Sequence, residues 1–219
     1  YLEEEVTYAS GDVTLAGTLT LPPGDARVPA LLLITGSGAQ DRDEEILGHK
    51  PFLVIADHLT RAGYAVLRMD DRGVGGSTGD DAQATYDDLL GDVLAGVAWL
   101  RVHPRVDAER VGLLGHSQGG YLAPAAAVAS DGAVAFTILL AGPGVDGFSV
   151  LLAQNELIIA QSMRAADPTV SDEDVAAAVA SQVAFLEALF PLLEAGDDDG
   201  ARALIRERVE SELAALPAE

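Results

Sequence analysis

Short apolar runs separated by amphipathic helical stretches constrain the fold of this chain more than any other feature of its sequence. Each run is rich in Leu, Val or Ile and lacks polar alternation, which is typical of strands buried on both faces of a parallel sheet. The runs occupy Ala30–Thr35, Ala65–Asp70, Val111–Gly115 and Val134–Ala141. The pattern therefore predicts an α/β fold in which βαβ units form four central strands.

Helical periodicity fills two of the intervals between these runs. Pro51 suits the first turn of a helix, and Gly63 suits the left-handed position just after its end. Apolar residues recur at helical spacing again over Leu89–Leu100, and Pro104 ends that stretch. We expect a crossover helix in each interval.

The two ends of the chain follow other patterns. Residues Glu4–Leu21 alternate apolar and polar side chains around a Ser-Gly-Asp turn, which predicts an antiparallel hairpin. After Gly147 the sequence becomes Ala-rich and offers no strand candidate. Helices are predicted over Val150–Ala165, Ser171–Leu193 and Gly200–Leu216. We therefore expect a core over residues 1–147 and a separate helical region over residues 148–219.

The composition narrows the classes of function. The 13 Lys and Arg residues against 35 Asp and Glu leave a formal net charge of −22, which repels phosphate backbones and anionic lipid, so nucleic acid and membrane are poor partners. Cysteine is absent, which excludes disulfides, thiolate metal sites and a Cys nucleophile. No uninterrupted apolar run approaches the roughly 20 residues that cross a bilayer. We expect a cytoplasmic protein without a cofactor, although a processed secreted form stays open.

The predicted strand Val111–Gly115 leads into the residues Gly115, His116, Ser117, Gln118 and Gly119 and then into Ala-rich helix. This is G-x-S-x-G in the strand, turn, helix context of a nucleophile elbow. The two glycines clear side chains from a tight turn, so we expect a strained backbone at Ser117 and an exposed hydroxyl. The N-terminus of the following helix would face a developing oxyanion. Ser117 is therefore the candidate nucleophile.

Two further loops follow the ends of predicted strands. The first buried strand ends in a Thr-Gly-Ser-Gly turn around Ser37, whose backbone N–H groups can supply one donor of an oxyanion hole. Gln118 would supply the other donor. The second strand ends in a glycine-rich loop over Asp70–Ser77, where Arg72 can pair with a carboxylate. We interpret Arg72 as structural.

These motifs together resemble the alpha/beta-hydrolase superfamily, in which D-x-R-G-x-G-x-S follows one strand and G-H-S-x-G-G the next. The segment Gly36–Asp43, followed by Lys50, Pro51 and Phe52, further resembles a bacterial carboxylesterase branch related to the acyl-peptidase-like hydrolases. The resemblance covers residues 4–145. It implies a Ser117 nucleophile, an oxyanion hole of N–H groups near Ser37 and Gln118, and a helical cap over an acyl pocket. The implied substrates are small carboxylic esters.

The histidines depart from the family pattern, in which the catalytic acid and His follow the Ser in chain order. All four histidines precede Ser117, at positions 49, 58, 103 and 116. His116 adjoins the nucleophile, but neighbouring side chains diverge on a sharp turn, so we expect it to pack beside the elbow. His58 and His103 are expected to be structural.

This departure leads to the expectation that the chain stops before the strands that carry the acid and the His. An unfinished sheet has an exposed edge, which predicts a homo-oligomer or pairing with a missing C-terminal polypeptide. A non-catalytic, hydrolase-like binding module stays the alternative to a serine esterase.

Two acidic runs raise the question of a metal site. Contiguous acids on a loop are more often solvated than ligating, and Asp197–Asp199 lack the spaced ligands and terminal Glu of a calcium loop. We therefore predict solvated loops and no bound metal. The runs are Asp41, Asp43, Glu44 and Glu45 beside His49, and Asp197–Asp199 within an exposed connector over Gly196–Gly200.

Overall fold

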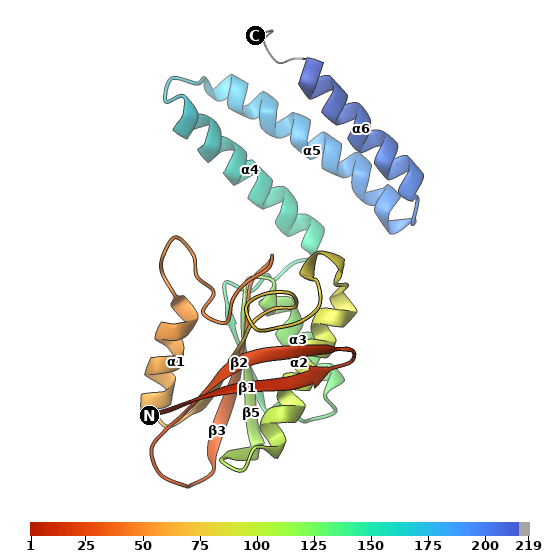
Figure 1. Cartoon of the computed structure of the whole chain (residues 1–219). Coiled ribbons are helices and arrows are strands. Elements are labelled where there is room, and N and C mark those ends of the chain that lie inside the picture. The colour runs from red at the N-terminus through yellow and green to blue at the C-terminus, as the bar shows by residue number, and fades with distance from the viewer. Residues whose placement is uncertain (215–219) are drawn as a thin grey trace. The chain divides into compact units, whose positions relative to one another are not determined.

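The structure is a computed structural model that describes residues 1–214. Its first part is a mostly parallel sheet in the order β1-β2-β4-β3-β5-β6 (Figure 1). The strands are β1 Leu2–Ser10, β2 Val13–Leu21, β3 Val28–Ile34, β4 Ala65–Met69, β5 Val106–His116 and β6 Phe136–Leu140. β1, β2 and β4 pair antiparallel, whereas β4, β3, β5 and β6 run parallel. The predicted α/β fold with an N-terminal hairpin is confirmed.

Helices cover both faces of the sheet (Figure 1). Helix α1 (Pro51–Arg61) buries Phe52 and Ala56 against alternate residues of β3 and β4 on one face. Helices α2 (Tyr86–Val102) and α3 (Gly119–Ala129) pack into the larger apolar cluster on the other face. Thr85 and Asp88 form a capping box at the start of α2. Both crossover helices lie where the apolar periodicity predicted them.

The strand β6 differs from its prediction as a strand buried on both faces. Phe136, Ile138 and Leu139 are 37%, 37% and 46% exposed. The reason is its place in the sheet, because β6 is the last strand in the order and pairs with β5 alone among the described residues. An apolar run therefore predicted the strand but not its burial.

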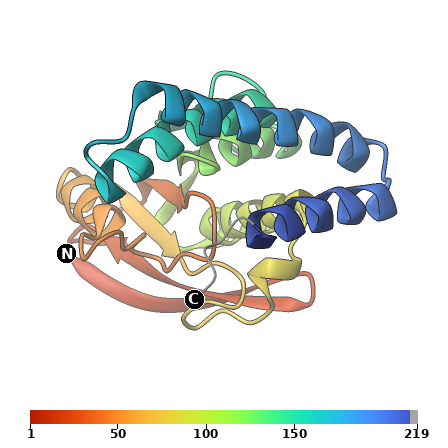
Figure 2. The ribbon, with the colours of Figure 1, turned by 90° about the horizontal axis from the view of Figure 1, so that it is seen from above.

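The chain divides into two compact units, the first ending at Pro143 and the second beginning at Gly144. The predicted boundary lies slightly later, after residue 147. The second unit contains α4 (Gly147–Ala166), α5 (Asp172–Glu194) and α6 (Asp198–Ala214), and α5 contacts both of the others (Figure 2). The predicted end of the last helix, at Leu216, lies outside the described residues.

The connector between α5 and α6 is shorter than predicted. Helix α6 begins at Asp198, so most of the Gly196–Gly200 segment is helical. Asp197 accepts a hydrogen bond from the backbone N of Gly200 at 3.0 Å, and acidic side chains are favourable in a first helical turn. The three aspartates are exposed, as predicted, but they start a helix rather than lie in a loop.

Helix α5 is long and apolar enough to cross a membrane by length and composition alone. The helix meets this criterion through its mean hydropathy, because Ser181, Gln182 and Glu187 interrupt its apolar residues and no uninterrupted run in it approaches 20 residues. One such helix is weak evidence for a membrane-spanning segment, because buried helices of water-soluble proteins pass the same test.

Candidate active site

The turn between β5 and α3, residues 115–120, is called the elbow below. Ser117 has a φ of 49°, in the left-handed region that non-glycine residues rarely adopt. Its N–H donates to the carbonyl of Leu140 at 3.0 Å, and its own carbonyl accepts from Gly120 N at 2.8 Å. The side chain is partly exposed at the end of the central strand. The predicted strained backbone at Ser117 is confirmed.

The glycines of the elbow are required by close backbone packing. A Cβ on Gly115 would collide with the carbonyl group of Gly119, and one on Gly119 would lie 2.5 Å from the carbonyl oxygen of Ile34. A Cβ on Gly120 would lie 2.5 Å from Cα of Gly142. Side chains at these positions would push the strand, the turn and the helix apart. Steric contact therefore fixes the shape of the elbow.

The segment from Gly36 to Lys50, called the tethered loop below, lies against the elbow. A Cβ on Gly36 would be 3.4 Å from Cβ of Ser117. The N–H of Gly36 donates to Glu44, whereas the N–H groups of Ser37 and Gln118 have no partner among residues 1–214. Gly36, Gly38 and Gln118 line a pocket of about 20 Å³, room for roughly one water molecule. Two free N–H donors therefore belong to the two segments that the sequence singled out.

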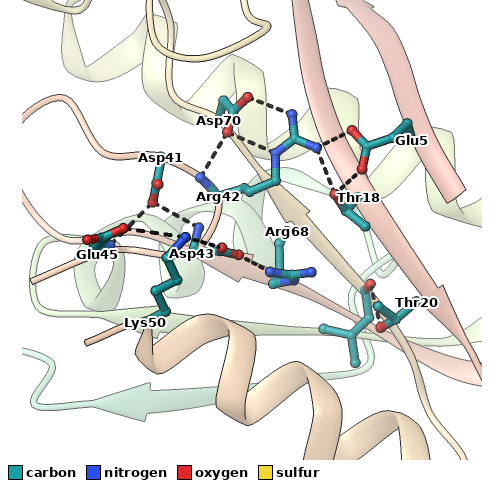
Figure 3. A network of polar contacts seen from close by, with 11 residues as sticks. Glu5, Thr18, Thr20, Asp41, Arg42, Asp43, Glu45, Lys50, Arg68 and Asp70 are labelled. Atoms are coloured by element: carbon teal, nitrogen blue, oxygen red, sulfur yellow. Dashed lines mark hydrogen bonds and ion pairs between the residues drawn. The ribbon is translucent and has the colours of Figure 1, made fainter. Parts of the chain in front are cut away.

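Arg42 ties the tethered loop to the sheet (Figure 3). Its guanidinium donates to both carboxylate oxygens of Asp70, at 3.0 and 2.7 Å, and to Glu5 and Thr18 at 2.5 and 2.7 Å. The Asp70 side chain is 3% exposed. Burial raises the pKa of Asp70, but hydrogen bonds from Arg42 and from Gly76 N outweigh it and leave that pKa below its usual value.

Asp43 forms a second tether from the same loop (Figure 3). It pairs with the buried side chain of Arg68 on β4 and with Lys50 at 3.3 Å. Asp41 stays within the loop, where its carboxylate accepts from the backbone N of Asp43 at 3.0 Å and of Glu45 at 3.3 Å. Among the described residues no group of three or more His, Asp or Glu side chains could hold a metal ion.

Glu44 is the buried member of this acidic run. Its side chain is 2% exposed, and its Oε1 accepts from Gly36 N at 2.7 Å and lies 2.7 Å from His116 Nδ1. The prediction that the whole run is solvated is therefore wrong, because its side chains fasten the loop. The sequence signal that marks them is that their run begins after the Gly-Ser-Gly turn with two residues between.

Asp71 is a third carboxylate that fastens the loop, and sequence reasoning missed it. It accepts hydrogen bonds from Thr35 Oγ1 at 2.8 Å and from Gln40 N at 2.9 Å. Burial raises the pKa of Asp71 to about 7, although these two hydrogen bonds oppose the rise. No cation pairs with its carboxylate in the described part of the chain.

The remaining residues singled out from the sequence lie as follows. Arg72 pairs with the buried carboxylate of Asp92, at 2.5 and 2.9 Å, which confirms that it meets a carboxylate. His103 lies at the end of α2, with its Nε2 3.5 Å from Glu4 of β1, and His58 is exposed on α1. His116 packs next to Ser117 within the elbow, where its Nδ1 contacts Glu44.

The fold and the elbow together define an alpha/beta hydrolase. The comparisons with known proteins agree, because the chain matches the family described as X-Pro dipeptidyl-peptidase (S15 family) over residues 10–207. The chain therefore belongs to this family.

A curated relative and two solved structures are similar to parts of the chain. Esterase EstD of Thermotoga maritima is 35% identical over 139 residues, which cover 61% of this chain and 33% of the relative. The alpha/beta hydrolase GrgF of a Penicillium species matches with a TM-score of 0.57 and 27% identity, over 75% of this chain and 54% of GrgF. A dienelactone hydrolase of Anabaena variabilis matches with a TM-score of 0.51 and 26% identity, over 63% of this chain and 62% of the hydrolase. The chain thus spans about a third of its curated esterase relative.

Proposed function

We propose that the protein is a serine hydrolase that cleaves small carboxylic esters through an acyl-enzyme on Ser117. In the proposed reaction Ser117 Oγ attacks the ester carbonyl, the alcohol leaves, and water then releases the acid. The observation that carries the proposal is the φ of 49° at Ser117, at a strand-to-helix turn that holds the side chain partly exposed. The 35% identity to an esterase over 139 residues supports an ester as substrate.

The N–H groups of Ser37 and Gln118 form the proposed oxyanion hole. Both lack a partner among residues 1–214, and they come from the two segments that meet at Gly36 and Ser117. The N-terminus of α3, which begins at Gly119, adds favourable electrostatic potential for a developing negative charge.

A histidine from polypeptide outside these 219 residues is the proposed general base. The sequence has no histidine after Ser117, and His116 already contacts Glu44. The short coverage of EstD, 33% of its length, supports a longer functional chain. The exposed edge of β6 is the proposed site where a further strand or a second subunit pairs.

Fluorophosphonate labelling with mapping of the modified residue tests this proposal, on the 219-residue chain and on any longer product of the same gene. We expect modification of Ser117 in a polypeptide that contains the proposed histidine, loss of that modification in Ser117→Ala, and little modification of the 219-residue chain, which lacks this base. The matched control is Ser37→Ala, which removes an exposed hydroxyl but keeps the N–H proposed as donor, so labelling and p-nitrophenyl acetate hydrolysis persist. Turnover that survives Ser117→Ala would exclude Ser117 as the nucleophile.

Two rival functions have specific support. The family description names a dipeptidyl-peptidase, so an X-Pro p-nitroanilide is the competing substrate, and its cleavage in preference to esters would replace esterase by peptidase. The lack of a histidine after Ser117 favours a non-catalytic binding module. Absence of labelling and turnover in both the short chain and the longer product would establish that alternative.

A further inference from the structure

A single buried oxygen joins the tethered loop to the elbow. Glu44 Oε1 accepts the N–H of Gly36 at 2.7 Å and lies 2.7 Å from Nδ1 of His116. Gly36 directly precedes Ser37, the proposed oxyanion donor, and His116 directly precedes Ser117, the proposed nucleophile. Each of the two reacting positions is therefore one residue away from a contact to the same carboxylate.

The packing around Gly36 leaves little freedom in this arrangement. A Cβ built on Gly36 would lie 3.2 Å from Glu44 Oε1, 3.3 Å from His116 Nδ1 and 3.4 Å from Ser117 Cβ. The loop backbone, the carboxylate, the imidazole and the nucleophilic residue thus meet at one point. A buried carboxylate is stable only when its oxygens are hydrogen bonded, so moving either donor is costly.

The backbone at Glu44 is strained in the conformation that places its side chain against the elbow. Glu44 has a φ of 51°, which is unfavourable for a non-glycine residue. A turn holds it there, because Glu44 N donates to the carbonyl of Asp41 at 2.9 Å and the Asp41 side chain accepts from both neighbours of Glu44. Arg42 and Asp43 contact the sheet, at Asp70 and Arg68. An ordinary solvated loop residue needs no such arrangement.

We propose that Glu44 is a positioning residue, whose carboxylate holds the N–H of Gly36 and, through His116, fixes the direction of the Ser37 N–H relative to Ser117. This inference rests on the proposed function, and it deepens it by assigning the alignment of the oxyanion hole to one side chain. It also explains why Gly36 itself is not a donor to substrate, since its N–H is already used.

The test compares Glu44→Ala and Glu44→Gln with Glu45→Ala, the adjacent glutamate, which is exposed and pairs with Lys50 at 3.4 Å. Amide hydrogen exchange is measured first, because it does not depend on turnover. We expect the Gly36 amide to exchange at least about 10-fold faster in Glu44→Ala, with the amides of β5 unchanged. Glu44→Gln keeps an acceptor oxygen and restores most of the protection, and Glu45→Ala changes nothing.

Kinetics on whichever polypeptide turns over p-nitrophenyl acetate provide the second measurement. Glu44→Ala is expected to lower kcat by about 10- to 100-fold with little change in KM, because a misdirected donor weakens the transition state rather than substrate binding. Rescue by Glu44→Gln separates positioning from loss of fold.

The outcomes separate the two proposals. Unchanged exchange at Gly36 in Glu44→Ala, or unchanged kcat in an active polypeptide, overturns the role of Glu44. If no polypeptide labels at Ser117 or turns over, the proposed function fails. Faster exchange at Gly36 in Glu44→Ala then still supports the hold of Glu44 on the loop.

Discussion

The elbow and the tethered loop lie side by side, but different forces fix their shapes. The elbow is fixed by steric contact, since Gly115 and Gly119 leave no room for a side chain. The loop is fixed by polar side chains, since Arg42 and Glu44 reach from it to the sheet and the elbow, and Asp71 reaches back to it from the end of β4. A steric turn fails when an atom is added, and a polar loop fails when a charge is removed or neutralised. The predictions below exploit this difference.

Gly115→Ala is expected to have the largest effect. The added Cβ collides with backbone atoms of Gly119, which cannot move without separating α3 from β5. We expect a loss of more than about 4 kcal/mol in the free energy of unfolding, measured by chemical denaturation. The control is Gly91→Ala, at a helical position where a Cβ meets nothing within 4 Å, which should stabilise by up to about 1 kcal/mol. Equal stability of the two variants would disprove a sterically fixed elbow.

Asp71→Asn tests whether the loop, unlike the elbow, depends on pH. The pKa of Asp71 is raised to about 7 by burial, so folding favours its protonated form. Its contribution to stability is therefore full below the unfolded pKa near 3.8 and is lost as pH rises through 7. Relative to the wild type, Asp71→Asn should gain about 4 kcal/mol between pH 4 and pH 8.

The measurement is the free energy of unfolding of both proteins at several pH values. At pH 4 the carboxyl of Asp71 is protonated, and Asn can replace it, with its oxygen accepting from Gln40 N and its amide N–H donating to Thr35 Oγ1, so the two proteins are expected to have similar stability there. If the free energies of unfolding of the two proteins changed with pH in parallel, Asp71 would have an ordinary pKa, and the loop would not differ from the elbow in its dependence on pH.

Arg42→Ala removes the charge that pairs with buried Asp70. Breaking a buried ion pair strands the remaining charge, so we expect a loss of about 3 kcal/mol in unfolding free energy. Arg61→Ala is the matched control, since its pair with Asp57 lies at the surface, where solvent screens the charges and such a pair contributes little to stability. Similar losses in the two variants would mean that Arg42 does not hold the loop.

The same difference between steric and polar constraints explains what could be predicted from the sequence. The elbow was predictable because its motif, Gly115, Ser117 and Gly119, lies within five consecutive residues. The first crossover helix was predictable because its ends carry Pro51 and Gly63. Glu44 and His116 are separated by 72 residues, and a sequence shows which side chains are charged but not which ones meet. The apolar run of β6 wrongly predicted burial on both faces, although an exposed edge was expected for an unfinished sheet, because the order of the strands is not visible in the run itself.

The smallest predicted effect comes from a glycine of the loop rather than of the elbow. Gly38 has a φ of 87°, and a Cβ there meets nothing within 4 Å, so Gly38→Ala costs only backbone strain, about 1 kcal/mol. Gly24→Ala, with a φ of 94° and equally open space, should cost the same. Only Gly38→Ala is expected to slow fluorophosphonate labelling, because it adjoins the Ser37 N–H. Equal labelling rates in the two variants would show that the loop can shift at Gly38 without moving that donor.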